Sequence, residues 1–274
     1  MSTAIDRESR TRRVMHELKP RMVTVTEVEH ISPRYVRVTF AGDDLADFVS
    51  LSAGDHIKLA FPNPGEEEPV MPRLGEKGIM WPEGAARPVT RDYTPRHFDT
   101  DARTLVIEFV IHGEGPASAW AERAAPGQKL GVLGPRGSKV VEPVFDWYLM
   151  IGDETAIPSI ARRFEELPTD ARITALIEID GPDDEQPLPS GPNTDVRWLH
   201  RDATSDTNLL EAGTRELTLP DGEGFIWAGG EANSLRSVRR YLLNEAGHPR
   251  EWTSFDGHWK RGVADHDHHE PIED

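Results

Sequence analysis

The sequence predicts two domains of different architecture, an antiparallel β-barrel or sandwich followed by a parallel α/β domain. Three short runs in the first half alternate apolar and polar residues, as half-buried strands do: residues 22–28, 35–40 and 57–61. In the second half, the near-continuous apolar run at residues 147–151 is typical of a strand buried on both faces. Strands there alternate with helical patterns, which indicates a parallel sheet.

The first half continues with short strands separated by loops. Residues 62–90 are rich in proline, glycine and glutamate and predict a long loop. Strand patterns return at residues 91–96 and 105–111. We expect a short helix at 116–125 and a further strand at 128–134. Short strands with turns of this kind are typical of a barrel or a sandwich.

The second half repeats a strand–helix pattern. After the first strand we expect a helix across residues 156–167 and then strands at 173–179, 196–199 and 224–228. A last helix is predicted over residues 232–246, where apolar side chains recur at helical spacing. This order favours an open parallel sheet of the kind that binds nucleotides.

The predicted domains span residues 21–144 and 145–262. The boundary is placed near Asp146, where short alternating strand patterns give way to a near-continuous apolar run followed by helical patterns. Residues 1–20 are expected to be a polar leader, without the apolar segment of a signal peptide. Residues 263–274 are expected to be a disordered acidic tail. Three histidines of this tail could bind metal, although a surface tail is the simpler interpretation: His266, His268 and His269.

Composition excludes several classes of protein. Charged residues make up 29% and hydrophobic residues 37%, as in a soluble globular protein, and no apolar run reaches the roughly 20 residues that cross a bilayer. The absence of cysteine excludes disulfides, thiolate-held iron–sulfur clusters and cysteine nucleophiles, so redox chemistry would need a bound organic cofactor or a non-thiolate metal site. The net charge of −17 argues against nucleic-acid binding. We expect a cytoplasmic protein that binds neither nucleic acid nor membrane.

The most informative residues for function are Arg91, Tyr93 and Thr94. A cation, an aromatic ring and a hydroxyl at this spacing suit a flavin with its phosphate tail. In a strand, Arg91 and Tyr93 share one face and Thr94 lies on the other. Tyr93 could pack on the flavin ring, and Arg91 could hold a phosphate oxygen through its fork. The alternative explanation of this run alone is an ordinary amphipathic strand.

A second candidate cofactor contact lies at the start of the next predicted helix. Gly115, Ala117 and Ser118 are small, so backbone N–H groups there could approach a pyrophosphate, which the helix dipole favours. Taken alone, this run could simply start a helix. A flavin strand followed by such a helix start strengthens the prediction of a flavin site.

Further short motifs are distributed over most of the chain. They lie at residues 55–59, 81–82, 91–94, 112–113, 115–118, 133–138, 152–158, 229–231 and 258–262. As a set they resemble the ferredoxin-reductase-like flavoproteins and, within them, the siderophore-interacting protein family. The resemblance covers the chain from about Arg21 to Gly262. It implies an N-terminal antiparallel β-barrel that binds FAD, a C-terminal domain that binds NADPH or NADH, and a flavin in the cleft between them.

The resemblance also implies an activity, the reduction of a ferric siderophore to release Fe(II). Ferric siderophores are commonly anionic, and Lys58, Lys260 and Arg261 are the implied substrate contacts. For Lys58, a solvated lysine on an amphipathic strand is the alternative. His112 and Trp259 are implied cofactor contacts, with His112 as a structural neighbour of the flavin rather than an acid or base.

Two runs at strand ends of the second domain are candidate nucleotide contacts. Asp153, Thr155 and Ala156 follow its first strand, where open parallel sheets bind nucleotides, and the resemblance implies that they approach the flavin or nicotinamide. The run lacks the usual glycine-rich loop, which leaves tight nucleotide binding open. Gly230 and Glu231 end its fourth strand. Gly230 would allow close backbone approach, and Glu231 either serves the nicotinamide or begins a helix.

Two other activities remain compatible with the sequence. One is a general NAD(P)H:flavin or quinone oxidoreductase, and the other is a flavin-containing siderophore-binding protein that a ferredoxin reduces. The electron donor is also open. Glu178 and Asp180 follow the second α/β strand and would repel a 2′-phosphate, whereas the resemblance favours NADPH.

Overall fold

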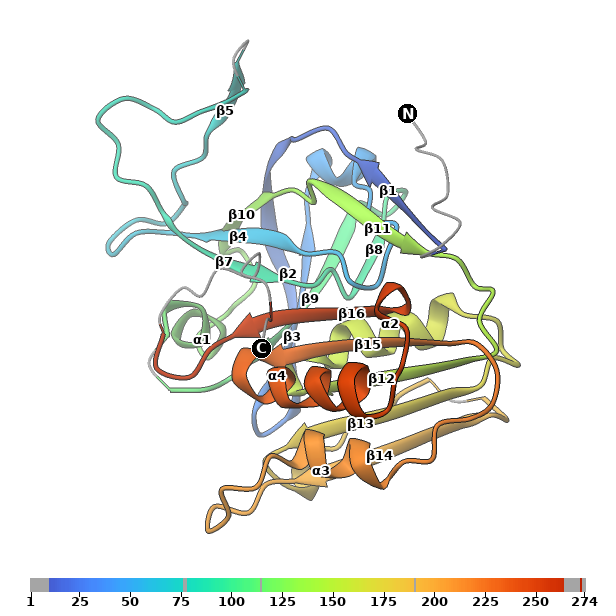
Figure 1. The fold of residues 1–274 in the computed structure, drawn as a ribbon. Helices are drawn as coiled ribbons and strands as arrows, with labels where there is room; N and C mark the ends of the chain where they lie inside the picture. Colours follow the sequence, from blue (N-terminus) through green and yellow to red (C-terminus); the bar gives the residue numbers. More distant parts are fainter. Residues whose placement is uncertain (1–9, 76–77, 114, 190, 264–271, 273–274) are drawn as a thin grey trace. The chain divides into compact units, whose positions relative to one another are not determined.

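The computed structural model describes residues 10–75, 78–113, 115–189, 191–263 and 272, and the chain forms two compact units (Figure 1). The first unit contains Arg12–Val140. The second contains Arg10, Thr11 and the described residues from Val141 onward. Within this described part, no helix is long and apolar enough to cross a membrane.

The first unit is built on a seven-stranded antiparallel sheet of order β7-β4-β10-β2-β3-β9-β8. Its strands are β2 (Pro20–Ser32), β3 (Tyr35–Ala41), β4 (Ile57–Phe61), β7 (Val89–Tyr93), β8 (His97–Asp99), β9 (Thr104–Val110) and β10 (Lys129–Leu133). Their inward side chains alternate with outward ones and form one apolar core around Phe40, Leu59 and Phe109. In the described part of the chain β7 and β8 are the edges of this sheet.

Short elements complete the first unit. They are a 3₁₀ turn at Asp43–Asp47, the hairpin β5 (Arg73–Gly75) and β6 (Gly78–Met80), helix α1 (Pro116–Ala121), and the pair β1 (Thr11–Met15) and β11 (Gly137–Val141). Two of them differ from the sequence prediction. The loop predicted at residues 62–90 contains the β5–β6 hairpin and the start of β7. The predicted polar leader contains β1, whose ladder with β11 needs no apolar pattern.

The second unit is a five-stranded parallel sheet of order β14-β13-β12-β15-β16. Its strands are β12 (Trp147–Asp153), β13 (Ile173–Ile179), β14 (Thr194–His200), β15 (Gly224–Glu231) and β16 (Thr253–Trp259). Its helices are α2 (Ile157–Glu166), α3 (Leu209–Glu216), α4 (Ala232–Arg240) and a π-helical turn at Tyr241–Glu245, with 3₁₀ turns at Glu154–Ala156, Pro182–Asp184 and Arg250–Trp252. The prediction of a parallel α/β sheet is confirmed.

The strand order creates a switch point at the carboxyl ends of β12 and β15. From β12 the chain adds β13 and β14 on one side, and it then returns to add β15 and β16 on the other (Figure 1). Ligands of open α/β sheets bind at such a point. Gly152 and Gly229 face each other there, and a Cβ on Gly152 would lie 2.6 Å from the Gly229 carbonyl oxygen. Glycine at position 152 therefore lets the two strands approach at the switch point.

The predicted tail at residues 263–274 lies largely outside the described residues, and so do His266, His268 and His269. Ile272 is described and belongs to the apolar core of the second unit.

Candidate functional site

Asp153, at the end of β12, joins the carboxyl ends of three strands. The side chain is 2% exposed. Its Oδ1 accepts hydrogen bonds from the Thr155 backbone N–H (2.9 Å) and hydroxyl (2.5 Å). Its Oδ2 accepts from the Glu231 backbone N–H and from the Trp259 indole, both at 2.8 Å. Asp153 and Trp259, both predicted cofactor contacts, bind each other in the structure and fix the switch point.

Gly230 is the glycine that this arrangement requires. It has a φ of +143°, and a Cβ at this position would lie 2.6 Å from Asp153 Oδ2. The close backbone approach that the sequence predicted at Gly230 is therefore an approach to Asp153.

Glu231 forms the N-cap of helix α4. Its Oε2 accepts from the Ser234 N–H at 2.7 Å, and its Oε1 accepts from the Asn233 amide and the Arg261 backbone N–H at 3.2 and 3.1 Å. Of the two interpretations that the sequence left open for Glu231, the structure supports the helix start. The cap also fixes the backbone of Arg261.

Thr155 and Ala156 differ in what they can reach. The Thr155 hydroxyl lies 3.0 Å from Nδ1 of His258, so the turn after β12 is joined to strand β16. Ala156 is fully buried, and a Cβ on Gly152 would meet its methyl group at 2.3 Å. The structure thus gives Ala156 a packing role, because its side chain fills the space that Gly152 leaves. Its cofactor contact stays a prediction.

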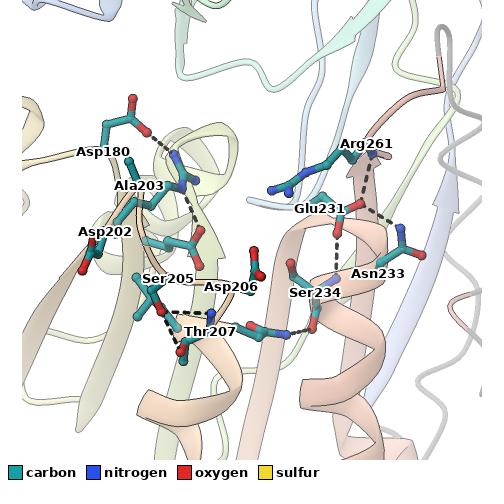
Figure 2. A pocket seen from close by; sticks show the side chains of 14 residues that line it. Asp180, Asp202, Ala203, Ser205, Asp206, Thr207, Glu231, Asn233, Ser234 and Arg261 are labelled. Atoms are coloured by element: carbon teal, nitrogen blue, oxygen red, sulfur yellow. Dashed lines mark hydrogen bonds and ion pairs between the residues drawn. The ribbon is translucent and has the colours of Figure 1, made fainter.

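A pocket of about 660 Å³ opens at the carboxyl edge of this sheet (Figure 2). Five carboxylates line it, together with two guanidinium groups, those of Arg201 and Arg261. The carboxylates are Glu178, Asp180, Asp202, Asp206 and Glu231. The remaining walls come from Ala203, Ser205, residues 207–209, and Asn233 and Ser234 at the start of α4.

Arg201 follows β14 directly and binds three carboxylates. It donates to both oxygens of Glu154 at 2.9 and 2.5 Å, to Glu178 at 2.7 Å and to Asp180 at 2.8 Å. Burial raises the pKa of the Glu154 carboxyl, and the paired guanidinium opposes that shift. Sequence reasoning missed Arg201. Its place immediately after the third parallel strand was the available signal.

The predicted flavin strand is β7, at an edge of the first unit's sheet. Arg91 lies opposite Leu59 and Tyr93 opposite Ile57, so both share the face of the sheet on which those two residues are buried. The Tyr93 ring lies 4.6 Å from that of Phe109, between ring centroids. Burial raises the pKa of the Tyr93 hydroxyl, so this group stays protonated. Thr94 is the first residue after β7.

Helix α1 begins a few residues after strand β9 of the same unit. Gly115 is the N-cap of α1, and no side chain of the described residues caps the helix. A Cβ on Gly115 would meet only the His112 ring, at 3.9 Å. The buried Ser118 hydroxyl accepts from the His112 N–H at 2.9 Å, so Ser118 and His112 fix the turn. The first-turn N–H groups of Ala117 and Ser118 have no carbonyl of the helix to bind.

These residues fit FAD by the chemistry of their groups. An aromatic ring at Tyr93 and a guanidinium at Arg91 suit a flavin and a phosphate, and uncapped backbone donors at Ala117 and Ser118 suit a pyrophosphate. Within the described residues, no group of three or more histidine, aspartate or glutamate side chains is arranged to hold a metal ion.

The predicted substrate contacts Lys58 and Lys260 are in different electrostatic environments. Lys58 Nζ donates to both oxygens of Asp92, at 3.0 and 2.8 Å, across the β4–β7 ladder. Lys260 has no ion-pair partner among the residues that the structure describes. The guanidinium of Arg261 points into the pocket of the second unit (Figure 2).

Comparison with known proteins identifies the family. A siderophore-interacting FAD-binding domain model matches residues 24–139, and a siderophore-interacting protein model matches residues 145–262. The chain belongs to the siderophore-interacting protein family. The resemblance predicted from the sequence is thereby confirmed.

Relatives of this siderophore-interacting protein include two named reductases. It is 34% identical over 256 residues to the ferric vibriobactin reductase of Vibrio cholerae, covering 92% of this chain and 93% of that protein. It is 36% identical over 241 residues to the NADPH-dependent ferric-chelate reductase of Escherichia coli, covering 87% and 92%.

Solved structures confirm the fold of this family member. A siderophore utilization protein from T. fusca has a TM-score of 0.87 and 43% identity, covering 94% of this chain and 99% of that one. The ferredoxin reductase of carbazole 1,9a-dioxygenase has a TM-score of 0.64 at 17% identity, covering 88% of this chain and 70% of that one. The fold is thus ferredoxin-reductase-like, as the sequence predicted.

Proposed function

We propose that this protein is an FAD-dependent ferric-siderophore reductase, which passes electrons from NAD(P)H to siderophore-bound Fe(III) and releases Fe(II). The observation that carries the proposal is the match of both halves of the chain to the siderophore-interacting family, together with full-length relatives named as ferric reductases. The reaction needs a pool of pyridine nucleotide, so we expect it to take place in the cytoplasm.

FAD, when bound, would join a two-electron donor to a one-electron acceptor. Tyr93 would pack on its ring system, Arg91 would hold a phosphate oxygen, and Thr94 would donate a hydrogen bond from its hydroxyl. The backbone N–H groups of Ala117 and Ser118 would hold the pyrophosphate. The fixed turn between His112 and Ser118 keeps these donors in place before the cofactor arrives.

Cations close to the substrate would hold an anionic ferric chelate against the chain's net charge of −17. Lys260 is the strongest candidate, because no described carboxylate compensates its charge. Lys58 is a weaker one, because Asp92 already binds it. Arg261 has its backbone held by Glu231, and its side chain lines the pocket of the second unit.

The test is anaerobic release of Fe(II) from a ferric siderophore by the FAD-loaded protein, trapped with a ferrous chelator. A ferric catecholate and a ferric hydroxamate are compared, with reactions that lack protein or nucleotide as controls. Release that requires both protein and nucleotide supports the proposal. Comparable turnover of free flavin or quinone would favour a general oxidoreductase. If Fe(II) is released only after a reduced ferredoxin is added, the electron donor is a ferredoxin and not a pyridine nucleotide.

A further inference from the structure

We infer that this protein discriminates between pyridine nucleotides and takes NADH in preference to NADPH, through the acidic pocket around Arg201. The inference rests on the proposed function, because it names the electron donor of that reaction. It concerns the choice of electron donor, which the sequence left open.

The position of the pocket assigns it to the adenosine end of a dinucleotide. Dinucleotides bind across the switch point of an open α/β sheet, and the end of the second strand meets the adenosine ribose. Here the second strand is β13, and Glu178 and Asp180 stand at its end. A carboxylate at this place accepts hydrogen bonds from a ribose with a free 2′-hydroxyl, whereas an arginine accommodates a 2′-phosphate.

Arg201 is the one arginine beside those two carboxylates in the described lining of the pocket. All three nitrogens of its guanidinium already donate, four times in total, to Glu154, Glu178 and Asp180. Three negative charges therefore surround one positive charge. A 2′-phosphate would have to displace these partners and would leave half-buried carboxylates without their counterion.

The rest of the pocket adds negative charge. Figure 2 shows the carboxylate of Asp206 between the wall that carries Asp180 and the wall that carries Glu231. Asp206 is exposed, and it has no hydrogen-bond or ion-pair partner among the described residues. A phosphate monoester carries up to two negative charges at neutral pH, so it is repelled where a hydroxyl is not.

Arg261 does not reverse this preference. Its guanidinium enters the pocket from the wall opposite Asp180 (Figure 2). From the end of β16, on the far side of the switch point, it can meet the pyrophosphate, which NADH and NADPH share. It therefore contributes affinity without discrimination. The Escherichia coli relative is named NADPH-dependent, so the preference expected here belongs to this chain's own pocket.

The first test is binding without turnover. Calorimetry of the FAD-loaded protein with NAD⁺ and with NADP⁺ is expected to give at least about tenfold tighter binding of NAD⁺ at low ionic strength. Anaerobic reduction of the flavin by NADH and by NADPH should show the same preference. Equal or tighter binding of NADP⁺ would overturn the inference.

The second test relieves Arg201 of two partners. The double variant Glu178→Gln with Asp180→Asn is expected to bind NADP⁺ about five- to tenfold more tightly than the unchanged protein. Asp195→Asn is the control, because it removes a carboxylate charge from an exposed pair with Arg197 outside the pocket. If the double variant fails to fold, Asp206→Asn at an exposed position gives the same comparison, with an expected gain of about two- to fivefold. A folded variant without any gain overturns the inference.

A third measurement separates this inference from the proposed function. The FAD-loaded protein is reduced with dithionite, freed of excess reductant and mixed with a ferric siderophore without nucleotide. Fe(II) release in this reaction supports the reductase whatever the donor is. If neither nucleotide binds, the inference fails, and the dithionite reaction still decides whether the protein reduces ferric siderophore.

Discussion

Asp153 and Trp259, which are 106 residues apart, form a 2.8 Å hydrogen bond between carboxylate and indole at the carboxyl edge of the parallel sheet. The same carboxylate oxygen accepts from the Glu231 N–H, so one side chain fixes the ends of β12, β15 and β16. The positions of Lys260 and Arg261, which follow Trp259 directly, depend on this bond.

Replacing Asp153 should therefore weaken both the fold and the placement of these cations. Asp153→Asn has one acceptor oxygen in place of two, so donors that are now satisfied lose their partner. We expect the free energy of unfolding to fall by about 2–4 kcal/mol, measured by urea denaturation. The control is Glu185→Gln, which breaks an exposed pair with His200 and should change the free energy of unfolding by less than about 0.5 kcal/mol. A loss below about 1 kcal/mol for Asp153→Asn would contradict the role given to this carboxylate.

The regular elements of the second unit could be predicted from the sequence, because burial on both faces leaves a clear apolar pattern. The strand predicted at 173–179 is β13, and the helix predicted at 156–167 contains α2. Strand β16 and helix α3 were missed. Only two residues of β16 are buried, so no apolar run reveals it, and α3 has eight residues including a glycine.

The candidate site was only partly predictable. Residues with a local motif, such as Arg91 and Tyr93, could be proposed from their spacing within one strand. Arg201 was not, because its partners lie 21, 23 and 47 residues away and meet it only when the strand ends align. The Asp153 network has the same origin, since its donors come from three separate strand ends. Such clusters depend on tertiary structure and leave no periodicity in the sequence.

Tyr93 offers a test of the flavin strand. Tyr93→Ala removes the ring that would pack on the flavin, and we expect FAD affinity to fall at least about tenfold. Tyr93→Phe keeps the ring and its packing on Phe109, so it should bind FAD within about threefold of the unchanged protein. The dissociation constant is measured from the change in flavin fluorescence on binding. Equal FAD affinity in all three proteins, each shown to be folded, would remove Tyr93 from the site.

Lys260 and Lys58 should differ as substrate contacts, because among the described residues only Lys58 has a carboxylate partner. Lys260→Ala is expected to raise the KM for an anionic ferric siderophore about three- to tenfold, with FAD content unchanged. Lys58→Ala should have a smaller effect, because Asp92 neutralises that lysine in the free protein. The control is Lys129→Ala, which removes a lysine of strand β10 that pairs with Glu68 at the surface, and it should leave the KM unchanged. The effect of Lys260 should shrink as salt is added. A KM unchanged in Lys260→Ala, or a larger effect at Lys58, would reverse this ranking.

His248 predicts how stability depends on pH. Its ring packs near those of Trp147 and Trp252, at centroid distances of 5.6 and 6.4 Å, and burial lowers its pKa below the ordinary value of 6.5. Below pH 6.5 the unfolded chain therefore binds a proton that the folded chain does not bind. The stability that the neutral ring contributes is complete above pH 6.5 and is lost as the pH falls from there towards the folded-state pKa.

The measurement is urea unfolding between pH 8 and pH 5 for the unchanged protein and for His248→Gln. Below pH 6.5 this histidine should contribute a slope of at most about 1.4 kcal/mol per pH unit, and His248→Gln should lose that part of the slope. The control is His97→Gln, at an exposed position, which should keep the same slope of unfolding free energy against pH as the unchanged protein. If His248→Gln and the unchanged protein lose stability in parallel on acidification, the acid sensitivity comes from other groups. If His248→Gln alone shows a flatter profile, the half-buried imidazole is the source of this acid sensitivity.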